Sequence, residues 1–459
     1  RRPHQNSRAR HYPDESYRMP SAASANLPVT TPKHLAIVTA GGAGMFCGSC
    51  MHDNTWARAL NSAGMHVTLI PTYTPIRVDE EDISTARVFF GGINIYLDYR
   101  YRFWRKLPRW LTGWLDSPWV IRLATRFGVS NDARDLGGLT LAMLEGELGP
   151  QKTLIDELSQ FLANDLKPDV ICFSNALLSG AVRTIKRETG RPVLCVLQGD
   201  DIFLDNLIEP YRGKAIDMLR ERVREIDGFL VHSAYYRDFM SDYLQIPADR
   251  FHLQPLGIDL EGHDGQPTRD TTRPFTVGYF ARICPEKGLL PLVEAFRLLH
   301  ERHPQVQLLA GGYLPPEHLP YYREVQRAAE PIQEAFRYVG SPETKSEKVH
   351  FFKSIDVLSV PTVYREPKGL YVLESLANGV PVVQPAHGSF PELIEQTGGG
   401  LLVPPGDAAE LAAGLERLLQ DPELRMNLGT QGQQSVREKF NSAEMTRRSV
   451  ELLQQFASD

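Results

Sequence analysis

Short apolar runs alternate with amphipathic stretches through the first half of this 459-residue chain. Alternation of this kind is typical of parallel strands whose faces are covered by helices. It predicts an α/β domain in which the run HLAIVT at 34–39 is followed by a glycine loop and a helix from about Asp53 to Ala63. The other predicted strands of this domain are Val67–Ile70, Val170–Phe173, Val193–Leu197 and Phe229–His232.

A second alternation follows the polar segment Glu261–Arg273, which has the composition of a linker. We therefore expect two α/β domains in tandem. Parallel sheets bind ligands at the carboxyl ends of their strands, so two such domains facing each other form a cleft. The predicted strands of the second domain are Phe275–Phe280, Val306–Gly311, Phe336–Val339, Val357–Val360, Val380–Gln384 and Leu401–Val403.

These patterns divide the chain into four parts. Residues 1–32 are polar, basic and proline-bearing, and we expect them to form a disordered leader. The first domain is predicted at 33–258 and the second at 259–441, and 442–457 has the pattern of a last helix.

Composition excludes some classes of protein. The net charge of −6 gives no bulk basic character for binding nucleic acid, and no run of about 18 apolar residues predicts a spanning helix. The five cysteines are few and odd in number, and Cys172 and Cys195 lie inside apolar runs. We therefore expect a reducing, cytoplasmic location.

One segment of the first domain, at about 95–127, is both aromatic and basic. It contains four of the five tryptophans, among several arginines. Such a segment can contact an anionic membrane surface peripherally, at the inner face of the membrane. Alternatively, it is a lid or subdomain whose aromatic side chains pack on the core.

The stretch from Tyr364 to Gly379 carries the strongest candidate chemistry. Glu366 and Glu374 are separated by seven residues, and Pro367 suits a first helical position. This pattern predicts Glu366 just ahead of a helix and Glu374 about two turns into it. The free N–H groups between them can receive an anionic phosphate, while the carboxylates accept hydrogen bonds from hydroxyls. A nucleotide sugar has that combination of groups, although two solvated surface glutamates would give the same spacing.

Two cations lie in the loop after the first predicted strand of the second domain. Arg282 and Lys287 are five residues apart at the carboxyl end of that strand, where they can hold a diphosphate.

Other ligand classes fit less well. The loop Gly41–Gly44 lacks the G-x-G-x-x-G spacing, and the second strand does not end in an acid, so a nicotinamide enzyme is disfavoured. Cys47 and Cys50 have no second cysteine pair that would complete a zinc site. A thioredoxin-like role lacks sequence context, so we interpret them as two reduced residues lining the glycine loop.

The order and spacing of several motifs resemble the retaining glycosyltransferases of family 4, which have GT-B architecture. The resemblance extends from about Lys33 to the C-terminus. The motifs are the AGGAG loop, Pro255–Asp259, Gly278–Gly288, Ser359–Thr362, Glu366 to Val383, Gly388 to Glu392 and Gly400–Asp407. It implies an α/β fold of two Rossmann-like domains facing across a cleft, with the last helix packed back on the first domain.

The resemblance also implies roles for individual residues. Arg282 and Lys287 would hold the diphosphate, Glu366 the sugar hydroxyls and Glu374 the ribose. Other implied donor contacts are Gly42, Gly44, Val339, Gly340, Lys368, Gly369 and Leu370.

The chain departs from the family on the acceptor side. Where many relatives have a histidine, this chain has Gln198, which cannot carry a proton. Asp200 or Asp201 either substitutes for that histidine or merely caps the next turn.

The resulting prediction is a retaining hexosyltransferase that uses a nucleoside-diphosphate sugar and a glycan, lipid or small-molecule acceptor. We expect neither a cofactor nor a metal, since the chain has no Asp-x-Asp pair. The alternatives are an epimerase or hydrolase of the same architecture and a binding-only relative.

Overall fold

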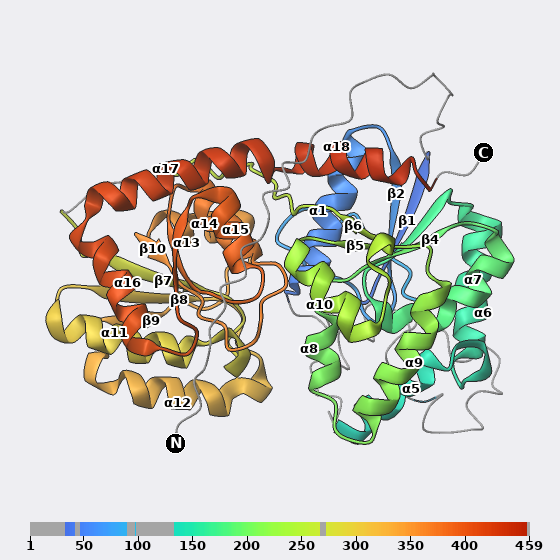
Figure 1. Cartoon of the computed structure of the whole chain (residues 1–459), viewed down its shortest axis with the longest axis horizontal. Coiled ribbons are helices and arrows are strands. Elements are labelled where there is room, and N and C mark those ends of the chain that lie inside the picture. The colour runs from blue at the N-terminus through green and yellow to red at the C-terminus, as the bar shows by residue number, and fades with distance from the viewer. Residues whose placement is uncertain (1–32, 42–45, 90–96, 98–132, 267–271, 457–459) are drawn as a thin grey trace, which may run out of the picture.

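The structure is a computed structural model that describes residues 33–41, 46–89, 97, 133–266 and 272–456. It contains two parallel sheets of six strands each, covered by helices, which confirms the predicted fold class (Figure 1). The leader 1–32, Gly42, Gly44, the end of the last predicted helix and all but Leu97 of the segment 95–127 lie outside the described residues.

The first sheet has the strand order β2-β1-β3-β4-β5-β6. Alternate residues of β1 point to opposite faces, so Ala36 and Val38 enter one hydrophobic cluster while Leu35 and Ile37 enter another. Both faces are therefore buried, as in other all-parallel sheets. The strands are β1 His34–Thr39, β2 His66–Pro71, β3 Val170–Phe173, β4 Val193–Val196, β5 Gly228–Val231 and β6 Phe251–Leu253.

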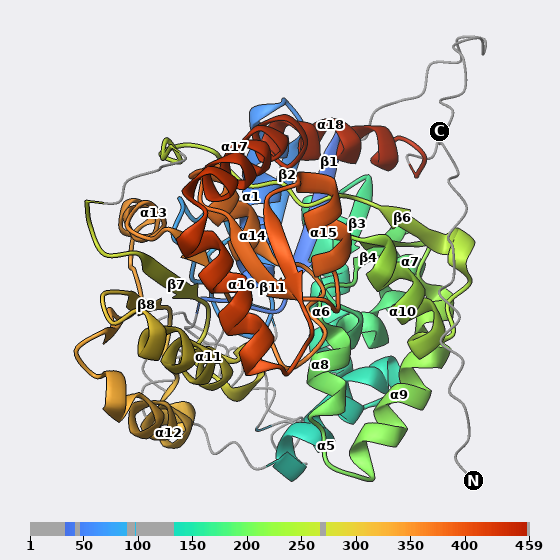
Figure 2. The same ribbon diagram turned by 60° about the vertical axis from the view of Figure 1, so that its left-hand side comes forward.

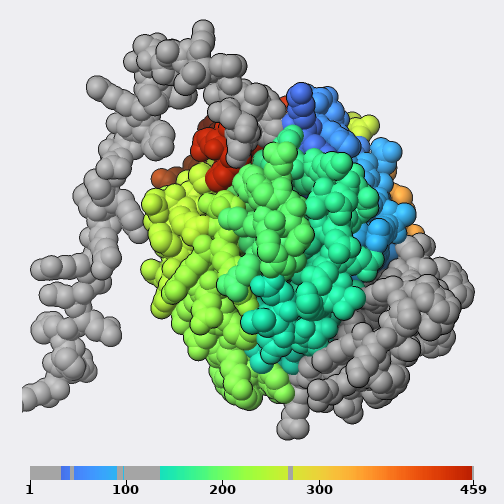
Figure 3. All heavy atoms as spheres, turned by 90° about the vertical axis from the view of Figure 1, so that its right-hand side faces the viewer, coloured from blue at the N-terminus to red at the C-terminus, as the bar shows by residue number. Residues whose placement is uncertain are grey.

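The described part of the first domain contains seven α-helices before residue 259. They are α1 Gly48–Ser62, α5 Ala133–Leu144, α6 Lys152–Gln160, α7 Val182–Thr189, α8 Asp200–Asp205, α9 Tyr211–Arg222 and α10 Ala234–Leu244. Figure 3 shows the face of this domain that is turned away from the second sheet, formed largely by the segments coloured cyan to green.

The second sheet has the order β12-β11-β10-β7-β8-β9 around a single large core. Its strands are β7 Thr276–Phe280, β8 Gln307–Gly311, β9 Phe336–Tyr338, β10 Val357–Leu358, β11 Val382–Pro385 and β12 Gly400–Val403. The α-helices around this sheet are α11 Leu289–Arg302, α12 Leu319–Ala329, α13 Lys345–Lys353, α14 Leu370–Ala377, α15 Phe390–Thr397, α16 Ala408–Gln420 and α17 Pro422–Lys439, and they are followed by the last helix, α18 Ser442–Leu453.

The last two helices connect the domains. Figures 1 and 2 show α17 lying along the second domain and α18 continuing over the first. Trp56 of α1 donates a hydrogen bond from Nε1 to Ser449 Oγ of α18, at 2.8 Å. At the crossing point, Ile258 N donates to Phe440 O and Ser442 N donates to Ile258 O, each at 2.9 Å. The two chain crossings between the domains are therefore hydrogen-bonded to each other.

Several sequence-predicted boundaries differ from the structure. Helix α1 begins at Gly48, five residues before the predicted start, and strand β6 was not predicted. Helix α14 begins at Leu370 and not at Pro367, because Gly369 takes a left-handed conformation (φ 80°) that ends the preceding loop. Glu374 is thus little more than one turn into the helix, not two.

Candidate active site

The candidate donor residues come from loops at the carboxyl ends of the second sheet's strands. Arg282 and Lys287 follow β7, Val339 and Gly340 follow β9, and Glu366 follows β10. Figure 1 shows that these loops lie between the second sheet and the first domain. The structure brings Lys287 and Glu366, which are 79 positions apart in the sequence, into contact.

Glu366 is buried and its carboxylate is fully hydrogen-bonded. Its Oε2 accepts from Lys287 Nζ at 2.7 Å, from the Tyr364 hydroxyl at 2.9 Å and from the Tyr371 hydroxyl at 3.0 Å. Burial by itself would raise the pKa of Glu366, but the Lys287 ammonium and these donors outweigh burial and hold the pKa at about 2. The side chain is therefore a permanent anion and an acceptor only.

The carboxylate of Glu366 also takes a place that the sequence had suggested for a phosphate. Its Oε1 accepts from the backbone N–H groups of Lys368 and Gly369, at 3.3 and 3.4 Å. Two of the N–H groups ahead of α14 are thus satisfied by Glu366 itself. Fewer of these N–H groups are therefore open to a ligand than the sequence pattern suggests.

Gly388 fixes the loop that carries Glu366. Its φ is +62°, and a Cβ at this position would lie 2.5 Å from Glu366 N and 2.6 Å from Glu366 O. Ser389 N donates to Glu366 O at 2.8 Å. Only glycine allows the loop after β11 to approach the Glu366 backbone this closely.

Glu374 forms a second buried charged group with two partners that sequence reasoning missed. Lys348 Nζ of α13 lies 2.6 Å from Glu374 Oε1 and 2.5 Å from Asp79 Oδ2 of the first domain. Burial raises the pKa of Glu374, with a further contribution from Asp79 against the effect of Lys348. Asp79 and Lys348 gave no sequence signal, because they lie in a loop and a helix far from the 364–379 stretch.

The remaining donor-side residues are more open. Arg282 has an exposed side chain, and Val339 is 45% exposed at the end of the edge strand β9. Gly340 O accepts from Gly312 N at 2.9 Å, which ties this edge to the loop after β8. Leu370 is the first residue of α14 and is partly buried. An exposed apolar side chain beside a glycine gives a flat surface on which a nucleobase can lie.

Lys368 reaches across to the first domain. Its Nζ donates to Gln198 Oε1 at 3.0 Å and to Ser49 Oγ at 3.1 Å. Gln198 Nε2 in turn donates to Asp53 Oδ1 at 3.2 Å and to Ser174 O at 3.0 Å. Gln198 is therefore held as a cross-domain hydrogen-bonding residue, and the Lys368 side chain joins the site in addition to its backbone.

Asp200 is occupied by the backbone. Oδ1 accepts from Ala176 N at 2.6 Å and Oδ2 accepts from Gln198 N at 3.1 Å. Burial raises its pKa to about 6, although these two donors act in the opposite direction. Asp200 therefore holds the backbone of the loops after β3 and β4, and these contacts do not cap the turn that follows it.

Glu392 makes a further contact between the domains. Its two carboxylate oxygens accept from Ala234 N and Tyr235 N, each at 3.0 Å, at the start of α10. Two unpaired N–H groups of a first-domain helix are thus capped by a second-domain carboxylate.

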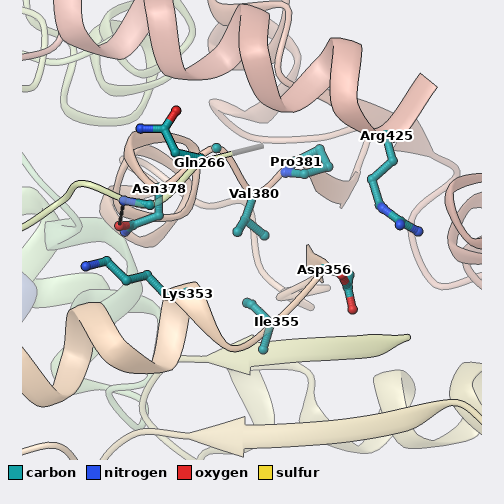
Figure 4. Close-up of a pocket in the computed structure, with 10 residues that line it drawn as sticks. Gln266, Lys353, Ile355, Asp356, Asn378, Val380, Pro381 and Arg425 are labelled. Atoms are coloured by element: carbon teal, nitrogen blue, oxygen red, sulfur yellow. Dashed lines mark hydrogen bonds between the residues drawn. The ribbon is translucent and has the colours of Figure 1, made fainter. Parts of the chain in front are cut away.

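A cavity of about 250 Å³ lies elsewhere in the second domain (Figure 4). Its lining residues Ile355 and Asp356 precede β10, and Val380 and Pro381 precede β11. It therefore opens at the amino ends of the strands, opposite the loops that carry Glu366, and it is separate from the candidate site.

None of the helices in the described ranges is long and apolar enough to cross a bilayer.

Comparison with solved structures identifies the class of fold. A sucrose-phosphate synthase from Thermosynechococcus elongatus superimposes with a TM-score of 0.66 at 19% identity, covering 92% of this chain and 98% of that one. A HepE protein of Anabaena, solved in complex with UDP, superimposes with a TM-score of 0.65 at 16% identity, covering 92% and 100%. The chain thus has the two-domain GT-B type of α/β fold.

Sequence comparison gives a family match for the second domain. Residues 265–435 match the family model described as "Glycosyl transferases group 1". The MMP alpha-(1->4)-mannosyltransferase of Mycolicibacterium hassiacum is 30% identical over 233 residues, covering 49% of this chain and 53% of that protein. The chain spans about half the length of the curated relatives that it matches. The predicted resemblance is therefore confirmed at the level of group 1.

Proposed function

We propose that the chain is a retaining glycosyltransferase that moves a hexosyl unit from a nucleoside-diphosphate sugar to an acceptor hydroxyl, without a metal ion. The observation that carries this proposal is the contact of Lys287 with Glu366, 2.7 Å apart, inside a domain that matches the group 1 family. A partly buried cation and a buried anion thus contact each other in the loops that we assign to the diphosphate and the sugar.

The donor half of the proposal rests on the chemistry of these side chains. Lys287 and Arg282 can stabilise the negative charge that develops on the departing diphosphate. Glu366 accepts hydrogen bonds from sugar hydroxyls, and its saturated shell implies that hydroxyls replace one or more of its present donors. Glu374 accepts from the ribose hydroxyls in the same way, with Lys348 as the donor that is displaced.

The relatives support the same donor class. The similar protein of Mycolicibacterium hassiacum is a mannosyltransferase, and structural neighbours from Anabaena hold UDP and UDP-glucose.

Retention and metal independence rest on residues of the chain. The first-domain group nearest to Lys368 on the acceptor side is the amide of Gln198, which cannot act as a base. We infer that the acceptor attacks from the face of the leaving group, whose phosphate oxygen takes the acceptor's proton. Cations of the protein, Arg282 and Lys287, replace the metal ion that an Asp-x-Asp pair would bind.

Turnover distinguishes the proposal from its alternatives. The purified chain is incubated with UDP- and GDP-sugars, with and without sugar or lipid acceptors, and nucleotide release is followed in the presence of EDTA. Acceptor-dependent release and a product of unchanged anomeric configuration, read by NMR, are expected. Donor conversion without acceptor would indicate an epimerase or hydrolase, and tight binding without turnover would indicate a binding protein. Loss of activity with EDTA would contradict metal independence.

We also infer a cytoplasmic location with peripheral contact to the inner membrane face through the segment 95–127. Its tryptophans and arginines suit an anionic lipid surface. Binding to anionic vesicles should fall as salt rises and when Arg102, Arg105 and Arg109 are changed to glutamate. Absence of binding even at low salt would remove this part of the proposal.

A further inference from the structure

Two cysteines begin the first long helix of the chain. Cys47 is the N-cap residue of the 15-residue helix α1, and Cys50 is its third residue. Both are free thiols; Cys47 is partly exposed and Cys50 is 2% exposed. A C-x-x-C pair at a helix start combines an accessible thiol with a sheltered one three residues later. The sequence alone gave no context for this pair.

The structure supplies that context through Lys368. Its Nζ lies 3.1 Å from Ser49 Oγ and 3.9 Å from the point where a Cβ on Gly48 would be. The ammonium group of the second domain therefore lies against the two residues that separate the thiols. Lys368 is only 8% exposed, so its charge is little screened by water.

The charge of Lys368 is not neutralised by a carboxylate. Its hydrogen-bond acceptors, Ser49 Oγ and Gln198 Oε1, are both neutral. Within the described part of the chain, its ammonium forms no ion pair with an aspartate or glutamate. The N-terminus of α1 adds a partial positive charge at the same place. A negative charge on the Cys47 sulfur would stabilise this arrangement.

The two thiols are differentiated accordingly. The Cys50 thiol, the N–H groups of Cys50 and Ser49 and the Lys368 ammonium lower the pKa of Cys47 to about 5, against the effect of burial. The Cys47 thiol, together with burial and Asp53, raises the pKa of Cys50 well above its usual value. Cys47 therefore has the properties of an attacking thiolate and Cys50 those of a resolving thiol.

We propose that Cys47 and Cys50 are a redox-active dithiol that reduces low-molecular-weight disulfides and closes into an intramolecular disulfide. The Cys47 thiolate attacks one sulfur of the small disulfide, forms a mixed disulfide and releases one small thiolate. Cys50 then loses its proton and attacks Cys47 Sγ, which releases the second thiolate. The protein dithiol loses two electrons and two protons, and the small disulfide becomes two thiols.

The other three cysteines provide internal controls. Cys172 and Cys195 are fully buried in β3 and β4, and Cys284 is fully buried after β7. Burial raises the pKa of each of these three thiols. They should stay reduced under conditions that oxidise the pair.

The test uses the full chain in glutathione buffers of increasing oxidised fraction, quenched by alkylation and read by mass spectrometry with peptide mapping. We expect a Cys47–Cys50 disulfide, and in Cys50→Ser a stable glutathione adduct on Cys47. Cys47→Ser should form neither product. An unmodified Cys47 in folded Cys50→Ser, or oxidation that begins at Cys284, would overturn the proposal.

A second measurement tests the contribution of Lys368. The pH–rate profile of Cys47 alkylation by iodoacetamide should shift upward by about one unit in Lys368→Met. Below pH 5, where the thiolate is the minor form, the rate should then fall about tenfold, because one unit of thiol pKa there corresponds to a factor of ten in thiolate fraction. The control is Lys353→Met, at a lysine that pairs with Asp264 far from the thiols. Equal alkylation rates below pH 5 in the wild type and in Lys368→Met would refute the proposal that the Lys368 charge lowers the pKa of Cys47. Neither measurement requires glycosyl transfer, so the result is independent of the proposed function.

Discussion

Glu366 is the buried carboxylate of the candidate site that accepts hydrogen bonds from several donors at once. Its carboxylate is 4% exposed and accepts from an ammonium, two phenols and two backbone N–H groups. A buried anion with this many donors is held in one orientation before a ligand binds. The same contacts couple its ionisation to folding.

This coupling predicts a pH dependence of stability. The folded-state pKa of Glu366 is held at about 2, below the ordinary 4.5, so its ionised form stabilises the fold above about pH 4.5. That stabilisation, about 3 kcal/mol, is lost as the pH falls from 4.5 toward 2. In urea unfolding, Glu366→Gln should be less stable than the wild type by a constant amount between pH 7 and 5. The difference in unfolding free energy between the wild type and Glu366→Gln should become smaller below pH 4.5. A difference that becomes larger there would contradict the assigned contacts of Glu366.

Lys287 is predicted to act mainly on turnover. If it stabilises the departing diphosphate, Lys287→Ala should lower kcat/KM by about a hundredfold or more, which corresponds to about 3 kcal/mol of transition-state stabilisation. Initial rates of nucleotide release measure this effect. Lys353→Ala removes a lysine from the same domain, outside the site, and should retain wild-type rates. Equal rates in the two variants would refute the role of Lys287.

At the scale of elements, the loop after β11 holds the loop after β10 in place. The contact depends on Gly388, whose added Cβ would meet Glu366 N at 2.5 Å. Gly388→Ala should therefore destabilise the chain by about 3 kcal/mol or more, through positive-φ strain together with displacement of the Glu366 loop. Urea unfolding gives the stability, and nucleotide release should fall in parallel.

Gly406→Ala separates the two contributions. Its φ of +75° resembles that of Gly388, but a Cβ there would meet nothing within 4 Å. Gly406→Ala should lower the free energy of unfolding only by the backbone strain, about 1–2 kcal/mol, and should leave turnover unchanged. If both substitutions cost the same, the close approach at Gly388 does not constrain the Glu366 loop.

The strands of both sheets could be predicted from the sequence because buried parallel strands are short, nearly continuous apolar runs. Strand β6 was missed because its pattern, Phe251-His252-Leu253, is too short to stand out, and Leu253 is 46% exposed at the sheet edge. The start of α14 was predicted three residues early, since Pro367 favours a helix start while the left-handed Gly369 delays it.

Charged partners that come from distant segments could not be predicted. Lys287 was found because it follows an apolar strand run, and Glu366 because it precedes Pro367 and a helical apolar pattern. Lys348 and Asp79 meet Glu374 only after the domains dock, and no local pattern in either segment indicates that contact. The same reasoning applies to Lys368 and the Cys47–Cys50 pair, whose relation depends on tertiary structure alone.

At the scale of the whole molecule, contacts between the domains define a closed arrangement. Glu392 caps α10 across the interface, and Asp79 joins Lys348 at the other donor glutamate. These contacts bring both sets of loops together. In the proposed reaction, such closure would exclude water that competes with the acceptor for the donor.

Glu392→Ala should loosen this closure. We expect a larger radius of gyration by small-angle scattering and a higher ratio of donor hydrolysis to transfer. Glu395→Ala changes an exposed glutamate of the same helix and is the matched control. An unchanged radius and an unchanged ratio in Glu392→Ala would show that the cap does not hold the domains together.

The central claim is that the loops around Glu366 and Glu374 bind a nucleoside-diphosphate sugar. The most direct test is a thermal-shift screen of UDP, GDP and ADP and their hexose conjugates, with the wild type, Lys287→Ala and Glu374→Ala. A ligand at a hundred times its Kd should stabilise the fold by about 2.7 kcal/mol. We predict that one nucleotide series raises the Tm of the wild type and that both variants lose most of the shift. The absence of a shift with every series, or equal shifts in the wild type and both variants, would contradict the assigned site.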